Sequence, residues 1–284
     1  MLEIKSLSDI VSTLAEGPIW QSQTSSVTWT DIPNNVIHTA ELISGKSHSL
    51  QTPTLVSTIV EGHNGDLMVG TKEGIAKIGL SGDFQVVEEF LDSDMRMNDG
   101  KVDPRGNFWL GSLALDFQAH RGSLFEFDVH GKRRVIEEKV TLSNGMGWSP
   151  DLQSFYYIDS IPGVLYRYDY DISTGTISNK SILVEFDSSK GIPDGLCISK
   201  DGLIVIAMWD GRRLEILDAQ GKKIEEHLLP VSRPTSCCFA GDDYSTLVVT
   251  TASQDIDRVS EPLAGKVLVL TGTGLSGLPS YKYG

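Results

Sequence analysis

Residues 104–131 read PRGNFWLGSLALDFQAHRGSLFEFDVHG, and this stretch decides the fold class. A turn at 104–107 leads into an apolar-rich run at 108–113. A second run at 123–129 ends at a His-Gly turn. Short apolar-rich runs bounded by turn residues are typical of β-strands. The stretch therefore predicts two strands of one sheet.

The same arrangement recurs along the whole chain. Six strand-end signatures follow one another at steps of 40, 41, 48, 48 and 43 residues, and they end at Asp31, Thr71, Ser112, Ser160, Met208 and Thr251. A strand-rich repeat of roughly 40–50 residues indicates a propeller. We predict an all-β fold in which residues 1–284 form a single domain. That domain is a six-bladed β-propeller of four-stranded antiparallel blades around a central channel.

The two ends of the chain both look like strands. Residues 2–5 and 266–270 are short runs with strand character. Pairing them in one shared blade would close the ring and protect two exposed edges.

Composition narrows the possible partners and the location. The net charge is −14, which argues against nucleic acid as a partner. Apolar runs are no longer than a strand, and the first residues lack a secretory signal, so we expect no membrane association. The chain has three cysteines, Cys197, Cys237 and Cys238. An odd number with two adjacent is not a disulfide framework, which favours the reducing cytoplasm. We expect a monomer or a weak dimer.

Each repeat opens with a small polar residue or an acid-plus-glycine pair. In a propeller these openers surround one mouth of the channel, and they are Glu16, Ser57, Asn98, Asn144, Asp194 and Ser236. Asn-Gly and Asp-Gly pairs are by themselves ordinary turn dipeptides. Two carboxylates and two amides at equivalent positions, however, are hard oxygen donors that suit Ca²⁺, Mg²⁺ or Mn²⁺. The openers therefore predict a divalent-cation site.

Five segments together resemble the senescence marker protein/gluconolactonase/regucalcin family. They are residues 15–20 (AEGPIW), 96–104 (RMNDGKVDP), 143–149 (SNGMGWS), 156–160 (YYIDS) and 192–195 (IPDG). The resemblance extends from about residue 14 to 282. It implies a six-bladed propeller with one divalent metal ion, either Ca²⁺, Zn²⁺, Mn²⁺ or Mg²⁺, at the channel mouth. It also implies hydrolysis of lactones, sugar lactones especially.

The resemblance assigns roles to six residues. It implies that Glu16, Asn144 and Asp194 hold the metal ion. It implies that Arg96 and Asn98 face the substrate. Asp116 stands where relatives with this pattern often carry a glutamate, so its carboxylate reaches one methylene less far toward a sugar hydroxyl.

The chemistry of these residues agrees with a hydrolase. A lactone carbonyl gains negative charge when water attacks it, and a metal ion can polarise that carbonyl or activate the water. We expect a sugar lactone as the substrate, an aldonic acid as the product and Asp194 as the candidate general base. Two alternatives stay open. One is a lactonase, esterase or phosphotriesterase acting on a non-sugar substrate, and the other is a calcium-binding regulator without turnover.

Overall fold

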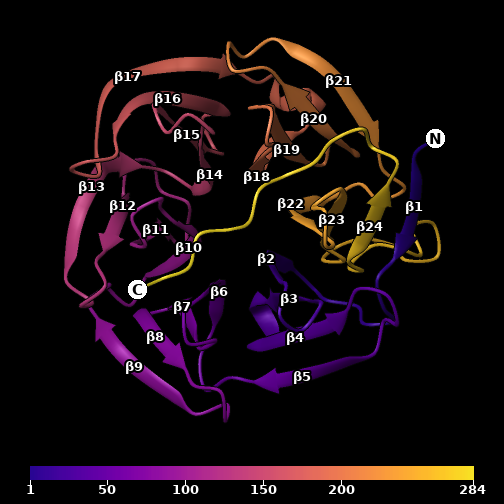
Figure 1. The fold of residues 1–284 in the computed structure, drawn as a ribbon, viewed down its shortest axis with the longest axis horizontal. Helices are drawn as coiled ribbons and strands as arrows, with labels where there is room; N and C mark the ends of the chain where they lie inside the picture. The colour runs from indigo at the N-terminus through magenta and orange to yellow at the C-terminus, as the bar shows by residue number, and fades with distance from the viewer.

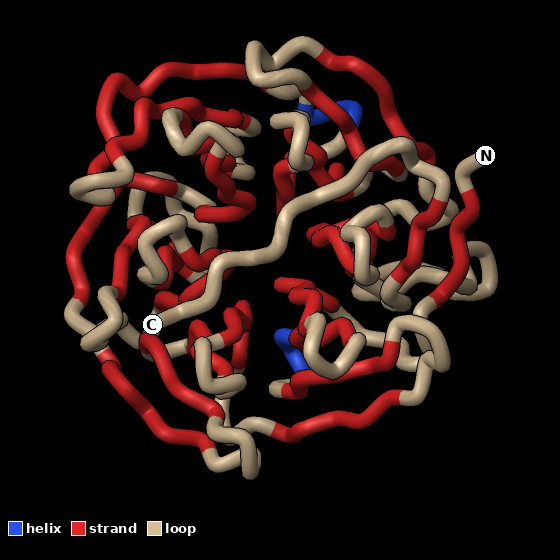
Figure 2. Tube along the Cα trace, in the orientation of Figure 1, coloured by secondary structure: helices blue, strands red, loops and turns tan.

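The computed structural model describes residues 1–284 as a ring of six antiparallel sheets around a central channel (Figure 1). Each sheet has four strands in chain order from the channel to the rim, except in the last sheet. The helical segments are two short 3₁₀ turns, Ile32–Asn34 and Ser188–Lys190 (Figure 2). The predicted all-β, six-bladed propeller with four-stranded blades is confirmed.

Each blade begins with an innermost strand at the channel and ends with an outermost strand at the rim. Blade 1 comprises β2 (Ala15–Gln21), β3 (Ser26–Asp31), β4 (Val36–Glu41) and β5 (Ser47–Gln51). Blade 2 comprises β6 (Val56–Glu61), β7 (Leu67–Thr71), β8 (Gly74–Ile78) and β9 (Phe84–Glu89). Blade 3 comprises β10 (Met95–Val102), β11 (Phe108–Ala114), β12 (Gly122–Phe127) and β13 (Arg133–Val140). Blade 4 comprises β14 (Ser143–Trp148), β15 (Ser154–Asp159), β16 (Val164–Asp171) and β17 (Thr176–Glu185). Blade 5 comprises β18 (Ile192–Ile198), β19 (Ile204–Trp209), β20 (Arg213–Leu217) and β21 (Lys223–Leu228). Blade 6 comprises β22 (Pro234–Ala240), β23 (Thr246–Thr251), β24 (Leu268–Thr271) and β1 (Glu3–Ser6).

The first strand of the chain completes the last blade. β1 runs antiparallel to β24, with Ile4 opposite Leu270 and Lys5 opposite Val269. The predicted pairing of the two chain ends is confirmed. It fastens the first blade to the last and so keeps the ring closed.

Aromatic side chains fill much of the space between blades 3 and 4. Trp109 of blade 3 packs against Trp148 and Phe155 of blade 4, with ring centroids 5.3 and 4.9 Å apart. The Trp109 indole also donates a hydrogen bond to Asp103 Oδ2 at 3.2 Å. Large buried rings of this kind hold the blades at a fixed spacing, and this spacing fixes where the innermost strands stand. No helix of the structure has the length and apolar character needed to cross a membrane.

Candidate metal and substrate site

The openers lie at interruptions of the β-ladder. In all six blades the pairing between the innermost and second strands shifts register beside the opener, which is a β-bulge. In β14 the ladder stops at Ser143 and resumes at Met146, and in β18 it stops at Pro193 and resumes at Leu196. The side chains inside these gaps are freed from the alternation of the strand and can be aimed at the channel mouth.

Glycines next to two openers let the innermost strands approach closely. A Cβ atom added to Gly145 would lie 2.6 Å from the backbone nitrogen of Leu196. A Cβ added to Gly195 would lie 2.2 Å from Ser236 Oγ. Neither position has room for a side chain. The close approach of neighbouring strands at the mouth therefore requires glycine in both the Asn-Gly and the Asp-Gly pair.

Aspartates at the ends of two second strands fix the segments that lead into the mouth. Asp159 accepts hydrogen bonds from the N–H groups of residues 141 and 142, at 2.9 and 2.8 Å. That segment runs directly into Asn144. In blade 1, Asp31 accepts equivalent bonds from residues 13 and 14, both at 3.1 Å. These charge-assisted bonds explain why an aspartate recurs at the end of the second strand.

A chain of hydrogen bonds crosses three blades at the mouth. Arg96 Nη1 donates to Asn98 Oδ1 at 2.7 Å, and Asn98 Nδ2 donates to Asn144 Oδ1 at 3.2 Å. Asn144 Nδ2 donates to Ser160 Oγ at 2.9 Å. The Ser160 hydroxyl donates to the Pro193 carbonyl at 2.6 Å. The chain ends at the residue preceding the blade 5 opener, so it fixes three of the openers relative to one another.

This network orients the amide of Asn144. Its nitrogen donates to Ser160 Oγ, and its oxygen accepts from Asn98 Nδ2, so the oxygen faces the blade 3 opener. An amide oxygen has two lone pairs, and here Asn98 uses one of them. The second lone pair is free to bind a cation.

Acidic side chains crowd the same space. Burial raises the pKa of Glu16 well above its ordinary value, and the charges of Asp194 and Asp99 raise it further. Burial also raises the pKa of Asp194, and Asp99 again adds to the effect. Carboxylates that share a desolvated site repel one another and hold protons. A divalent cation would relieve this repulsion.

Two basic groups partly balance these acids. Burial lowers the pKa of Arg96 to about 10, although the charges of Glu16 and Asp194 oppose the change. Burial raises the pKa of Asp99, and the Lys101 ammonium acts in the opposite direction. Arg96 stays protonated at neutral pH, so the mouth combines one guanidinium with several acids.

The donor set fits a hard divalent cation. Glu16 and Asp194 offer carboxylate oxygens, and Asn144 offers an oriented amide oxygen. No group of three His, Cys, Asp or Glu side chains in the structure is placed to hold a metal ion. A cation at this mouth would therefore depend on the Asn144 amide as its third protein ligand.

Asp116 stands apart from these residues. It lies exposed in the loop between β11 and β12, where its Oδ1 accepts a hydrogen bond from the Gln118 N–H at 3.0 Å. No hydrogen bond or ion pair joins it to the other predicted site residues. The same loop exposes Leu115 and Phe117, which are 45% and 50% exposed.

Two residues at the channel mouth, Asp99 and Ser160, were not assigned a role from the sequence. Asp99 shares a bulge with Asn98, and its signal was the acid beside the blade 3 opener. Ser160 follows Asp159 at the end of the second strand, and its signal was its place in a recurring strand-end signature. The roles of both follow from side-chain direction, which spacing alone does not give.

Comparison with known proteins gives a consistent family assignment. Residues 14–253 match the family model for the SMP-30/Gluconolactonase/LRE-like region. Regucalcin from Danio rerio is 34% identical over 278 residues, which cover 95% of this chain and 94% of that protein. Regucalcin from Gallus gallus is 33% identical over 282 residues, which cover 95% and 94%.

Solved structures agree with this assignment. A luciferin-regenerating enzyme superposes with a TM-score of 0.92 at 29% identity, covering 100% of this chain and 99% of that one. A gluconolactonase from Xanthomonas campestris superposes with a TM-score of 0.78 at 17% identity, covering 95% and 89%, and at that identity it supports the fold alone. The chain belongs to the SMP-30/gluconolactonase/LRE-like family.

Proposed function

We propose that the protein is a divalent-metal-dependent lactonase that hydrolyses a sugar lactone to the aldonic acid. Membership of the family supports a lactonase-like activity in general. The observation that carries the finer proposal is the mouth itself. There two buried, repelling carboxylates face an oriented amide oxygen and a guanidinium.

Glu16, Asn144 and Asp194 would hold the cation. When bound, such an ion polarises a carbonyl or lowers the pKa of a bound water. Asp194 would also accept the proton of the attacking water, because it directly follows Pro193, at whose carbonyl the network that crosses blades 3 to 5 ends.

Arg96 is suited to holding a polyhydroxylated substrate. Its Nη1 donates to Asn98 Oδ1 and to the Met97 carbonyl, at 2.7 and 2.9 Å. A guanidinium has five N–H donors in a fixed fork, so Nη2 and Nε remain for sugar oxygens. Asn98 mainly positions Arg96 and Asn144, and it keeps one lone pair on Oδ1 for a substrate hydroxyl. We propose that Asp116 contacts a more distant hydroxyl from its loop.

One observation favours a second candidate. Leu115 and Phe117 flank Asp116 and are about half exposed, so this loop offers apolar surface as well as a carboxylate. A luciferin-regenerating enzyme is also among the similar structures. A lactone or ester with an apolar group is therefore the alternative substrate class.

We also propose that the protein works in the cytoplasm. The free state of all three cysteines fits a reducing compartment of this kind.

A substrate panel separates the two candidates. Initial rates would be compared, at fixed Mn²⁺, for D-glucono-1,5-lactone, for a ring of the same size without hydroxyls, and for an aryl ester. We expect a kcat/KM at least about 100-fold higher for the hydroxylated lactone, since the loss of paired hydroxyls leaves site donors unsatisfied. A preference for the aryl ester would transfer support to the second candidate. No turnover of any of them by folded, metal-loaded protein would favour a binding protein.

A further inference from the structure

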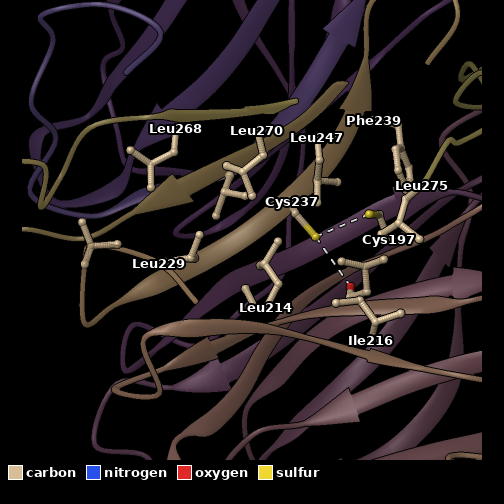
Figure 3. Close-up of a cluster of buried hydrophobic side chains, with 14 residues drawn as sticks. Cys197, Leu214, Ile216, Leu229, Cys237, Phe239, Leu247, Leu268, Leu270 and Leu275 are labelled. Atoms are coloured by element: carbon tan, nitrogen blue, oxygen red, sulfur yellow. Dashed lines mark hydrogen bonds between the residues drawn. The ribbon is translucent and has the colours of Figure 1, made fainter. Parts of the chain in front are cut away.

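Two thiols touch between the innermost strands of blades 5 and 6. Cys197 of β18 and Cys237 of β22 have their sulfur atoms 3.4 Å apart (Figure 3). Both side chains are buried, at 6% and 3% exposure, in one apolar cluster shared by the two blades. The Cys237 thiol also donates to the Val205 carbonyl at 3.6 Å. The catalytic proposal uses neither thiol.

The pair borders a cavity inside the channel. The cavity has a volume of about 190 Å³, and the residues that line it include Cys197, Cys237 and Lys101. Residues 278–282 of the C-terminal segment also line it, and this segment crosses the centre of the ring (Figure 1). A space of this size holds several water-sized molecules. A small oxidant that enters the channel therefore has room next to the strand segments that carry Cys197 and Cys237.

The ammonium group of Lys101 lies near the thiol pair. Lys101 Nζ reaches across the channel and donates to the Leu196 carbonyl at 2.9 Å, one residue before Cys197. The contact with Cys197 and burial raise the pKa of the Cys237 thiol, and the Lys101 charge opposes that rise. A nearby ammonium favours the thiolate, which is the reactive form. Oxidation of this pair should thus be slow at neutral pH and faster at alkaline pH.

We propose that Cys197 and Cys237 form an oxidisable pair that closes to a disulfide between blades 5 and 6. With hydrogen peroxide as the oxidant, one thiolate attacks a peroxide oxygen, the O–O bond breaks, and a sulfenic acid and water form. The second thiol then attacks that sulfur, and a second water leaves. The net change is two thiols and one peroxide to one disulfide and two waters. The sulfur atoms must approach by roughly 1.4 Å to reach the bonded distance of about 2.0 Å.

Cys238 provides an internal control. It follows Cys237 on β22, so its side chain points to the opposite face of the strand. It packs against a different cluster, formed with residues of blade 1. It also lines the cavity, so it is exposed to the same oxidant without having a sulfur partner.

The test is peptide mapping of the folded, full-length protein after hydrogen peroxide treatment at pH 8.5. Free thiols are alkylated after unfolding. We expect a Cys197–Cys237 linked peptide, an alkylated Cys238, and a melting temperature that rises by roughly 5–10 °C and falls back with dithiothreitol. Cys238→Ser should form the link equally well, and Cys237→Ser should not form it.

The wild-type map alone decides the matter if a variant fails to fold. Absence of an intramolecular link after prolonged oxidation would overturn the proposal. A link through Cys238, a link between two molecules, or oxidation of these thiols only to sulfinic acid would overturn it as well. None of these outcomes bears on the lactonase proposal, because neither thiol belongs to the site mouth.

Discussion

The two ends of the channel are built from the same six strands and differ in nearly every property. At the end where the innermost strands begin, bulges interrupt the ladder and gather Glu16, Asn144 and Asp194. Toward the other end the ladder is regular, and apolar side chains such as Trp20 and Trp148 accompany the thiols. The acidic cluster therefore lies where the sheet is interrupted, and large apolar side chains line the channel where the ladder is continuous.

The C-terminal segment strengthens this difference by covering only the second end. Lys282 forms an ion pair with Glu61 at 3.1 Å, and the Tyr283 hydroxyl donates to the Asp128 carbonyl at 2.6 Å. The Gly284 N–H donates to the Gly106 carbonyl at 3.1 Å. The segment is thus fastened to blades 2 and 3, at the end of the channel away from the acidic mouth.

Among the variants that probe the contrast between the two ends, Glu16→Gln should give the largest effect. It removes one of two carboxylates that would offset a cation, so we expect metal-dependent hydrolysis to fall by at least about 100-fold. The metal-free variant should nevertheless melt at a higher temperature than the wild type, because one repelling charge is gone. Activity assays and melts in a chelator measure both. Glu3→Gln, at an exposed position, is the control and should change neither quantity. A metal-free Glu16→Gln protein that melts at a lower temperature than the wild type would contradict the proposed repulsion at the mouth.

Ser160→Ala should weaken the mouth without removing a ligand. Asn144 Nδ2 would lose its acceptor, and the amide oxygen would lose its fixed direction. We expect metal affinity to fall by about 10-fold and kcat at saturating metal to stay within about twofold. Metal titration of activity separates these two quantities. Ser181→Ala, on the rim of the same blade, should change neither, and an unaltered metal affinity in Ser160→Ala would show that this serine does not orient the ligand.

Deletion of residues 278–284 tests the other end. It removes the ion pair and the hydrogen bonds that hold the segment over the channel. We expect a melting temperature lower by roughly 5 °C. We expect kcat/KM to remain within about twofold, because distant sites act independently. A truncated protein that is folded but more than about tenfold less active would show that the two ends are coupled.

The smallest expected effect is on the pH dependence of stability. Because the folded-state pKa of Glu16 and of Asp194 is raised, the folded protein binds more protons than the unfolded chain. The metal-free protein should therefore lose stability as pH rises from about 4, the ordinary carboxylate value, through the raised folded-state values. Melts across this range should decline more steeply for the wild type than for Glu16→Gln, and added cation should flatten the wild-type decline. Equal slopes would contradict the proposed repulsion.

Much of this architecture was predictable from the sequence because residues one repeat apart occupy equivalent positions in neighbouring blades of a propeller. The recurring strand ends predicted the blades, and the strand-like chain ends predicted the closure seen between Ile4 and Leu270. The openers predicted that Asn98, Asn144 and Asp194 would meet at one mouth.

Other features depended on side-chain direction, which the repeat does not encode. The role of Ser160 follows from a rotamer that bridges Asn144 to the Pro193 carbonyl. Asp116 lies in a loop outside the repeat, so no equivalent position in other blades indicated where its side chain points. The contact between Cys197 and Cys237 joins two blades and has no signature in either one.

The most direct test of the central claim is metal-dependent hydrolysis of D-glucono-1,5-lactone. Metal-stripped protein would receive Ca²⁺, Mg²⁺, Mn²⁺ or Zn²⁺ separately, and initial rates would be followed with a pH indicator. The variants are Asp194→Asn and, as a matched control, Asp201→Asn in an exposed turn of the same blade. We predict turnover that requires a cation, persists in Asp201→Asn and falls by about 1000-fold in Asp194→Asn. Turnover that survives chelation, or that Asp194→Asn retains, would contradict a metal-dependent lactonase at this mouth.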